Sequence, residues 1–193
     1  MGRGSTRSPV GLDSVPPRAS AKRADVSTRA WRSVLLASFL TGMLPSLAAG
    51  ESEGPVKAAF LFNFARYVEW PPTVFANESA TIRLCVMGGS SFDEVVSASV
   101  SGRSVGSRPV AVEKVASLDG ADGCHLLFIE AGVEAPGPLV SERLGRLAIF
   151  TISDQPGFAA GGGIANFILV DQKIRFEINP SAARRAGLKI SSS

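Results

Sequence analysis

The single histidine of the chain, His125, is the side chain best suited to acid–base chemistry near neutral pH. A Ser-His-Asp or Cys-His catalyst needs that imidazole exposed beside a nucleophile. The best nucleophile, Cys124, is the preceding residue, and adjacent side chains on a strand point to opposite faces. The sequence therefore predicts a half-buried structural histidine and assigns no catalytic residue.

Two glycine-rich segments invite comparison with phosphate-binding loops. Residues 161–163 precede a predicted strand and lack the Gly-Lys-Ser/Thr of a Walker loop, which is typical of a tight turn or bulge. Residues 88–91 follow a strand and open a helix, as an anion site would, but Asp93 and Glu94 in the first turn would repel an anion. Neither segment predicts a nucleotide site.

Metal binding and carboxylate chemistry are equally poorly supported. Cys85, Cys124 and His125 make at most three candidate ligands, with no CxxC or HxxxH spacing. Asp154 ends a predicted strand, where α/β proteins often place functional groups, but its sequence neighbours supply no base or metal partner. We interpret Asp154 as capping the following turn. These exclusions favour a binding or regulatory domain with no cofactor over an enzyme.

The elements that must position these residues alternate between strand and helix. The chain has 193 residues, 45% of them apolar, which suffices for one domain plus a tail. The pattern predicts a single compact α/β domain with a mixed, mostly parallel sheet flanked by helices and ending in a β-hairpin and a short helix. Helices are predicted at 55–70, 91–100, 139–144 and 181–186, strands at 81–87, 109–116, 126–129 and 147–152, and the hairpin at 166–178.

Two predicted elements have distinct faces. The first helix carries an apolar stripe expected to face the core: Val56, Phe60, Phe64, Tyr67 and Val68. Phe62 lies on the opposite side of the helical wheel with Arg66 and Glu69, either as a partner-binding residue or, as the alternative, on a second packing surface of the helix. In the second hairpin strand a core face alternates with a charged face, Ile174, Phe176 and Ile178 against Lys173, Arg175 and Glu177.

The N-terminal segment differs in charge from the rest of the chain. Residues 1–49 carry a net charge of +5 and residues 50–193 a net charge of −2, which argues against a nucleic-acid binder. An apolar run over residues 34–47 is shorter than the roughly 20 residues of a membrane span and ends in small residues. We expect a secretory signal peptide cleaved after Ala48 or Ala49, with a retained membrane anchor as the alternative.

Export would place the only two cysteines, Cys85 and Cys124, in an oxidising compartment. If they lie on neighbouring strands a bridge is feasible, and in the chain-entropy model it would stabilise the domain by about 4 kcal/mol. Two buried thiols that never meet are the alternative. The spacing of the cysteines leaves both open.

Several segments together resemble the YfiR family of exported proteins. The helix of residues 56–71 (Val-Lys-Ala-Ala-Phe-Leu-Phe-Asn-Phe-Ala-Arg-Tyr-Val-Glu-Trp-Pro) is similar to that family's opening helix. Further matching segments are 84–88, 123–129, 151–154, 157–158, 162–167, 173–179 and 186–192. Each segment alone is a weak match to the family, but the order and spacing of all the segments over residues 55–193 are specific to it.

The resemblance implies a compact α/β fold that tends to form a homodimer, with Cys85–Cys124 as its structural disulfide. It also implies a periplasmic inhibitor that binds the periplasmic part of an inner-membrane diguanylate cyclase, so lowering cyclic di-GMP signalling and biofilm formation. The competing hypothesis is a small-molecule sensor or carrier with its ligand near Gly88, Ser153 and Asp154, at the carboxyl ends of the strands.

Two surfaces are candidates for binding a protein partner, because aromatic and arginine residues anchor many interfaces. The first is the face of the opening helix that carries Phe62, Arg66 and Glu69. The second joins the glycine-rich segment to the charged hairpin face and comprises Gly163, Ile164, Asn166, Arg175 and Glu177.

Overall fold

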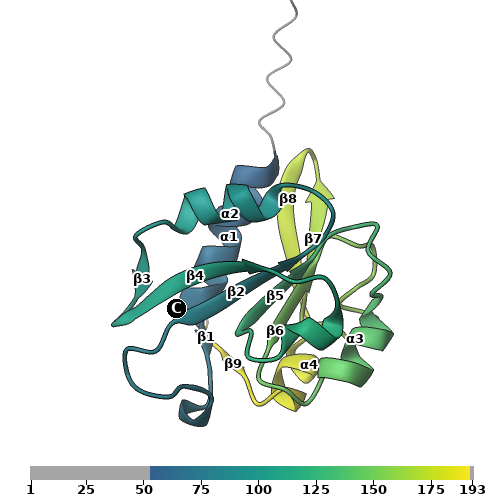
Figure 1. The fold of residues 1–193 in the computed structure, drawn as a ribbon. Helices are drawn as coiled ribbons and strands as arrows, with labels where there is room; N and C mark the ends of the chain where they lie inside the picture. Colours follow the sequence, from purple (N-terminus) through teal and green to yellow (C-terminus); the bar gives the residue numbers. More distant parts are fainter. Residues whose placement is uncertain (1–52, 192–193) are drawn as a thin grey trace, which may run out of the picture. The chain divides into compact units, whose positions relative to one another are not determined.

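The computed structural model describes residues 53–191, which fold into helices packed on a central mixed sheet (Figure 1). The helices are α1 (Glu53–Tyr67), α2 (Phe92–Val100), α3 (Gly137–Leu144) and α4 (Pro180–Arg185). The strands are β1 (Val68–Glu69), β2 (Ile82–Met87), β3 (Ser104–Val105), β4 (Arg108–Lys114), β5 (Leu126–Ile129), β6 (Phe150–Ser153), β7 (Ala165–Val170), β8 (Lys173–Ile178) and β9 (Lys189–Ile190). This confirms the predicted α/β class.

The main sheet has seven strands in the order β3-β4-β2-β5-β6-β7-β8. Its five inner strands are parallel to one another, and the two edge strands, β3 and β8, run antiparallel to their neighbours. Parallel strands need long crossover connections, which the helices supply, and the antiparallel edge at β8 follows from the C-terminal hairpin.

Two hydrophobic layers cover the sheet. In β5, Leu126 and Phe128 face the layer formed with α1 and α2, while Leu127 and Ile129 face the layer formed with α3. Because both faces are covered, this strand is a continuous apolar run, as the sequence predicted.

The C-terminal hairpin and its following helix are also confirmed. Asp171 and Gln172 adopt φ of 49° and 58°, the left-handed pair that a two-residue hairpin turn requires. The side-chain oxygen of Asn179 accepts a hydrogen bond from the Ala182 backbone N–H at 3.0 Å and so caps α4.

Several boundaries and short elements differ from the prediction. The strand expected at 147–152 starts at Phe150, because Leu147 and Ile149 instead close backbone turns onto Leu144 and Leu147. The structure adds β3, an antiparallel pair between β1 and β9, and short 3₁₀ helices at Pro72–Val74 and Leu118–Ala121. Two-residue strands carry too little periodicity to be found in a sequence.

Candidate interaction surface

Helix α1 packs against two neighbours at once, the main sheet and α2. Its buried side chains therefore occupy a wide arc rather than a narrow stripe: Ala58, Leu61, Phe62, Phe64 and Ala65. Phe64 reaches three strands, with ring centroids 5.2 Å from Phe150, 6.2 Å from Phe167 and 5.1 Å from Phe176. Helix α1 thus lies over β6, β7 and β8.

The opposite side of α1 faces solvent and carries both apolar and polar side chains. We call its residues the outer α1 stripe: Val56, Ala59, Asn63, Arg66 and Tyr67. Val56 is 39% exposed and Tyr67 38% exposed, although both were predicted to face the core. The stripe thus combines exposed apolar side chains with Asn63 and Arg66 on one side of the helix.

Of the two expectations for Phe62, the second packing surface is confirmed and the partner-binding role is wrong. Its side chain is only 4% exposed and packs on the α2 side of α1, with the Arg103 guanidinium carbon 3.6 Å from its ring centroid. The helical wheel placed Phe62 away from the sheet correctly, but it could not show that a second helix covers that side. Phe62 is therefore a core residue, and the partner-binding role predicted for it is withdrawn.

The other two residues predicted on this face are exposed. Arg66 is part of the outer α1 stripe, and its guanidinium carbon lies 5.9 Å from the Tyr67 ring centroid. Glu69 lies on β1, where the strand register sets it opposite Lys189 of β9. Their positions are compatible with partner binding, which stays a prediction.

The glycine-rich part of the second predicted surface is buried, so this prediction is also wrong. Gly163 has no room for a side chain because a Cβ would collide with the Phe158 ring. The Ile164 backbone N–H donates to the Thr151 hydroxyl at 3.2 Å. The Asn166 amide accepts from Phe158 N and donates to two backbone carbonyls. These three residues hold the interior together and present nothing to a partner.

The charged residues of the same predicted surface, Arg175 and Glu177, are exposed on β8. Between them, Phe176 faces α1 as predicted, with its ring centroid 5.6 Å from that of Phe60. Phe176 nevertheless remains 43% exposed, because α1 covers the edge strand only in part. Phe60 lies between this ring and the outer α1 stripe, so the apolar surface continues from the helix to β8.

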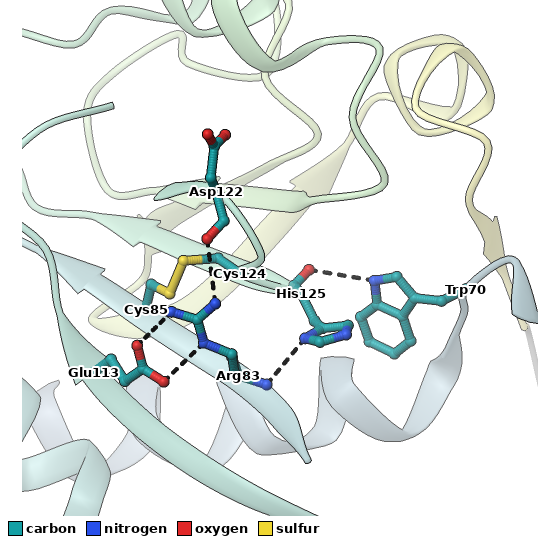
Figure 2. Close-up of a disulfide and its surroundings, with 7 residues drawn as sticks. All are labelled: Trp70, Arg83, Cys85, Glu113, Asp122, Cys124 and His125. Atoms are coloured by element: carbon teal, nitrogen blue, oxygen red, sulfur yellow. Dashed lines mark hydrogen bonds and ion pairs between the residues drawn. A yellow bond between two sulfur atoms is a disulfide. The ribbon is translucent and has the colours of Figure 1, made fainter. Parts of the chain in front are cut away.

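Away from this surface, the disulfide and the histidine form a compact internal cluster (Figure 2). Cys85 of β2 and Cys124, just before β5, are bonded, with a Cα–Cα separation of 5.9 Å. Beside them, the Arg83 guanidinium binds both carboxylate oxygens of Glu113, at 2.8 and 2.6 Å. These bonds raise the pKa of Arg83 and lower that of Glu113. The structure thus contains the Cys85–Cys124 disulfide that the resemblance implied.

His125 is buried in the same cluster and is held as an acceptor. Its Nδ1 accepts a hydrogen bond from the Arg83 backbone N–H at 3.1 Å, and its ring stacks on Phe75 at 4.7 Å. Burial, reinforced by the charges of Arg83 and Arg108, lowers the pKa of His125 below its usual value. The imidazole is therefore neutral at physiological pH and serves a structural role, as predicted.

The region suggested for a small-molecule ligand is only partly open. Glu130 occupies the space beside Gly88 and accepts from the backbone N–H of Ser90, and the Ser153 hydroxyl is bound to the Ile129 carbonyl. Asp154 instead lines a pocket of about 130 Å³ together with Lys57.

The predicted turn-capping role of Asp154 is wrong, because Gln155 N donates to the Ser153 hydroxyl and the Asp154 carboxylate bridges two distant segments instead. Oδ2 binds the Lys57 ammonium of α1 at 2.8 Å, and Oδ1 accepts from Ala131 N at 2.6 Å. Burial disfavours the charged ammonium, but the hydrogen bonds that it donates to Asp154 and Glu53, with the attraction of their charges, outweigh this, so the pKa of Lys57 is raised. Sequence reasoning missed this contact because its partners lie 97 residues apart.

These features define a disulfide-bonded α/β domain whose buried polar groups are satisfied and which exposes apolar side chains on α1 and on the β7–β8 hairpin. Within residues 53–191 every buried side-chain nitrogen and oxygen has a hydrogen-bond partner, and no helix there is long and apolar enough to cross a membrane. The chain belongs to the YfiR/HmsC-like family, whose model matches residues 55–193. A search of curated proteins finds no match.

Proposed function

We propose that this protein is exported to the periplasm and inhibits an inner-membrane signalling protein by binding its periplasmic part. The favoured target is a diguanylate cyclase, so that binding lowers cyclic di-GMP. Three observations support this: membership of the YfiR/HmsC-like family, the basic and apolar N-terminal segment, and a cysteine pair joined as in proteins from oxidising compartments. The proposal assigns the chain neither a catalytic residue nor a cofactor.

The outer α1 stripe is the observation that carries the proposal. Val56 and Tyr67 expose more than a third of their surface on a helix whose other sides are already packed. Aromatic and arginine side chains are enriched at interface cores, and Tyr67 with Arg66 supplies both on one face. A partner helix or loop laid along this stripe would bury it.

The proposal is tested in cells of the native host that lack the gene. Deletion should raise cyclic di-GMP, and the wild-type gene should restore the lower level. A Val56→Glu/Tyr67→Glu variant should fail to restore it, since two charges would be buried against the partner. Leu139→Glu is the matched control, because Leu139 is 36% exposed on α3, in the opposite layer.

The measurement needs equal periplasmic amounts of each variant, checked by immunoblotting of the periplasmic fraction. An unchanged cyclic di-GMP level after deletion, in cells that respond to other cyclase regulators, contradicts a cyclase target. Equal complementation by the stripe variant and the Leu139→Glu control contradicts the proposed surface.

A second candidate function, a small-molecule sensor, rests on the pocket beside Asp154. Its lining combines Lys57 and Asp154 with apolar residues of the β7–β8 hairpin, a mixture typical of ligand sites. A ligand should raise Tm in proportion to the logarithm of its concentration, and Asp154→Asn should reduce that shift. A thermal-shift screen of small polar metabolites in which none gives a concentration-dependent rise counts against this candidate.

A further inference from the structure

The imidazole of His125 has one ring nitrogen that the fold itself does not use. Nδ1 accepts from the Arg83 backbone N–H, so the proton of the neutral ring is on Nε2, which is a hydrogen-bond donor. The side chain is only 7% exposed, yet Nε2 has no acceptor within residues 53–191. Every fully enclosed side-chain nitrogen in the same residues has a partner, so Nε2 opens onto a surface that can be reached from outside.

That surface is a pocket of about 240 Å³ at the amino ends of β5 and β6, which the His125 ring helps to line. Figure 2 shows the second ring nitrogen on the edge of the imidazole away from Arg83. The 3₁₀ helix Pro72–Val74 and the turns before β6 supply other walls. The apolar lining consists of Val74, Cys124, Leu147, Ala148 and Ile149.

The apolar walls favour an organic ligand over water. Val74 is 37% exposed and Leu147 41% exposed, so both present apolar surface around the pocket. A water molecule on Nε2 would find few further partners among these side chains, whereas an ordered water normally makes two to four hydrogen bonds. A ligand with an acceptor atom and an apolar body satisfies the N–H and covers the walls together, as in most small-molecule sites.

The charges around the imidazole favour a negatively charged acceptor. After burial, the causes that lower the pKa of His125 are the charges of Arg83 and Arg108, both positive. Arg83 is paired with Glu113, but Arg108 donates only to backbone carbonyls and has no ion pair within residues 53–191. Figure 2 shows the Asp122 carboxylate turned away from the ring. An anionic oxygen on Nε2 is therefore attracted more strongly than a neutral one.

We propose that this pocket binds a small carboxylic acid with an apolar body. The carboxylate accepts the hydrogen bond from Nε2 of His125, and the ring or alkyl chain of the ligand lies against Val74 and Leu147. The site shares no residue with the pocket beside Asp154 or with the outer α1 stripe. The proposal therefore stands independently of both candidate functions.

Nuclear magnetic resonance of the purified protein with ¹⁵N-labelled histidine tests the proposal, with benzoate and hexanoate as probes. The chain has one histidine, so every imidazole signal reports on His125. At pH 7.5 the free protein should show the proton on Nε2. Either probe should shift the Nε2 resonance saturably, and benzoate should bind roughly tenfold more tightly than its neutral analogue benzamide.

Two leucine variants locate the binding site. Leu147→Glu should weaken benzoate binding roughly tenfold or more, because it replaces an apolar wall by a charge of the same sign as the ligand. Leu139→Glu is the matched control and should leave the affinity unchanged, since Leu139 is an exposed leucine on α3 that does not line this pocket. Circular dichroism and Tm show that both variants are folded.

A proton on Nδ1 in the free protein overturns the proposal, as does a Nε2 resonance that neither probe shifts up to its solubility limit. Equal affinities for benzoate and benzamide overturn the assignment of an acid. Equal effects of Leu147→Glu and Leu139→Glu overturn the assignment of the pocket. None of these outcomes depends on the cyclic di-GMP measurements in cells, so this proposal and the proposed inhibition can fail separately.

Discussion

At the scale of single residues, His125 shows how burial and hydrogen bonding keep an imidazole neutral and occupied in a structural role. Burial and the neighbouring charges of Arg83 and Arg108 lower its pKa, and the backbone N–H of Arg83 occupies Nδ1. The sequence predicted a structural histidine from its neighbour Cys124 and the apolar strand that follows. It could not predict the stacking partner Phe75, which belongs to a loop 50 residues earlier.

The lowered pKa of His125 predicts acid sensitivity near neutrality. Between its lowered folded-state pKa and the usual value of 6.5, the unfolded chain binds a proton that the folded chain does not. The free energy of unfolding should therefore decrease as the pH falls through 6.5, by at most about 1.4 kcal/mol per pH unit for one proton. Urea unfolding between pH 7.5 and 5 measures this slope.

His125→Gln is the control for that slope, because a Gln side-chain oxygen can still accept from Arg83 N but does not titrate. The chain has a single histidine, so the variant should have a flatter profile between pH 7.5 and 5. An equally steep profile in this variant would assign the acid sensitivity to other groups.

The bond between Cys85 and Cys124 should contribute substantially to stability. It closes a loop with a sequence separation of 39 residues, and loss of such a bridge typically costs about 2–5 kcal/mol. The Cys85→Ser/Cys124→Ser variant should show this loss in chemical unfolding. Reductant should destabilise the wild type to a similar extent and leave the double variant unaffected, and a wild type insensitive to reductant would contradict the prediction.

At the scale of elements, the hairpin and the first helix show what a sequence can and cannot supply. The β7–β8 hairpin was predicted correctly because alternation and a two-residue turn are local signals. The orientation of α1 was predicted only in part: Phe64 and Val68 face the core as expected, but the buried arc is set by both α2 and the sheet and leaves Val56 and Tyr67 exposed. The position of the exposed stripe depends on tertiary packing, which the helical pattern alone does not contain.

The orientation of α1 makes a direct prediction for substitutions on its two sides. Phe62→Ala should lower the free energy of unfolding by about 3–5 kcal/mol, because it leaves a cavity in the core between α1 and α2. Val56→Ala, on the outer α1 stripe, should change it by less than about 1 kcal/mol. Equal losses for the two variants, measured by chemical denaturation, would show that the assignment of faces is wrong.

At the scale of the whole domain, the ion pair between Lys57 and Asp154 connects the first described helix to the end of β6. Both side chains are mostly buried, at 16% and 20% exposure, and the Asp154 carboxylate also binds the loop after β5 through Ala131 N. One carboxylate thus joins three segments that are far apart in the chain. Residue types alone could not predict this, since Lys57 and Asp154 each look like ordinary surface charges in the sequence.

The coupling between Lys57 and Asp154 can be measured by a double-mutant cycle with Lys57→Met and Asp154→Asn. Each single variant leaves a partly buried charge without its main partner, so we expect losses of about 1–3 kcal/mol and a double variant less destabilised than the sum. Because the pKa of Lys57 is raised above 10.5, the coupling should persist as the pH rises from 7 to that value and disappear as the ammonium deprotonates above it. Strictly additive losses at pH 7 would mean that the two charges act separately and that the fold is held at this point by the Ala131 hydrogen bond alone.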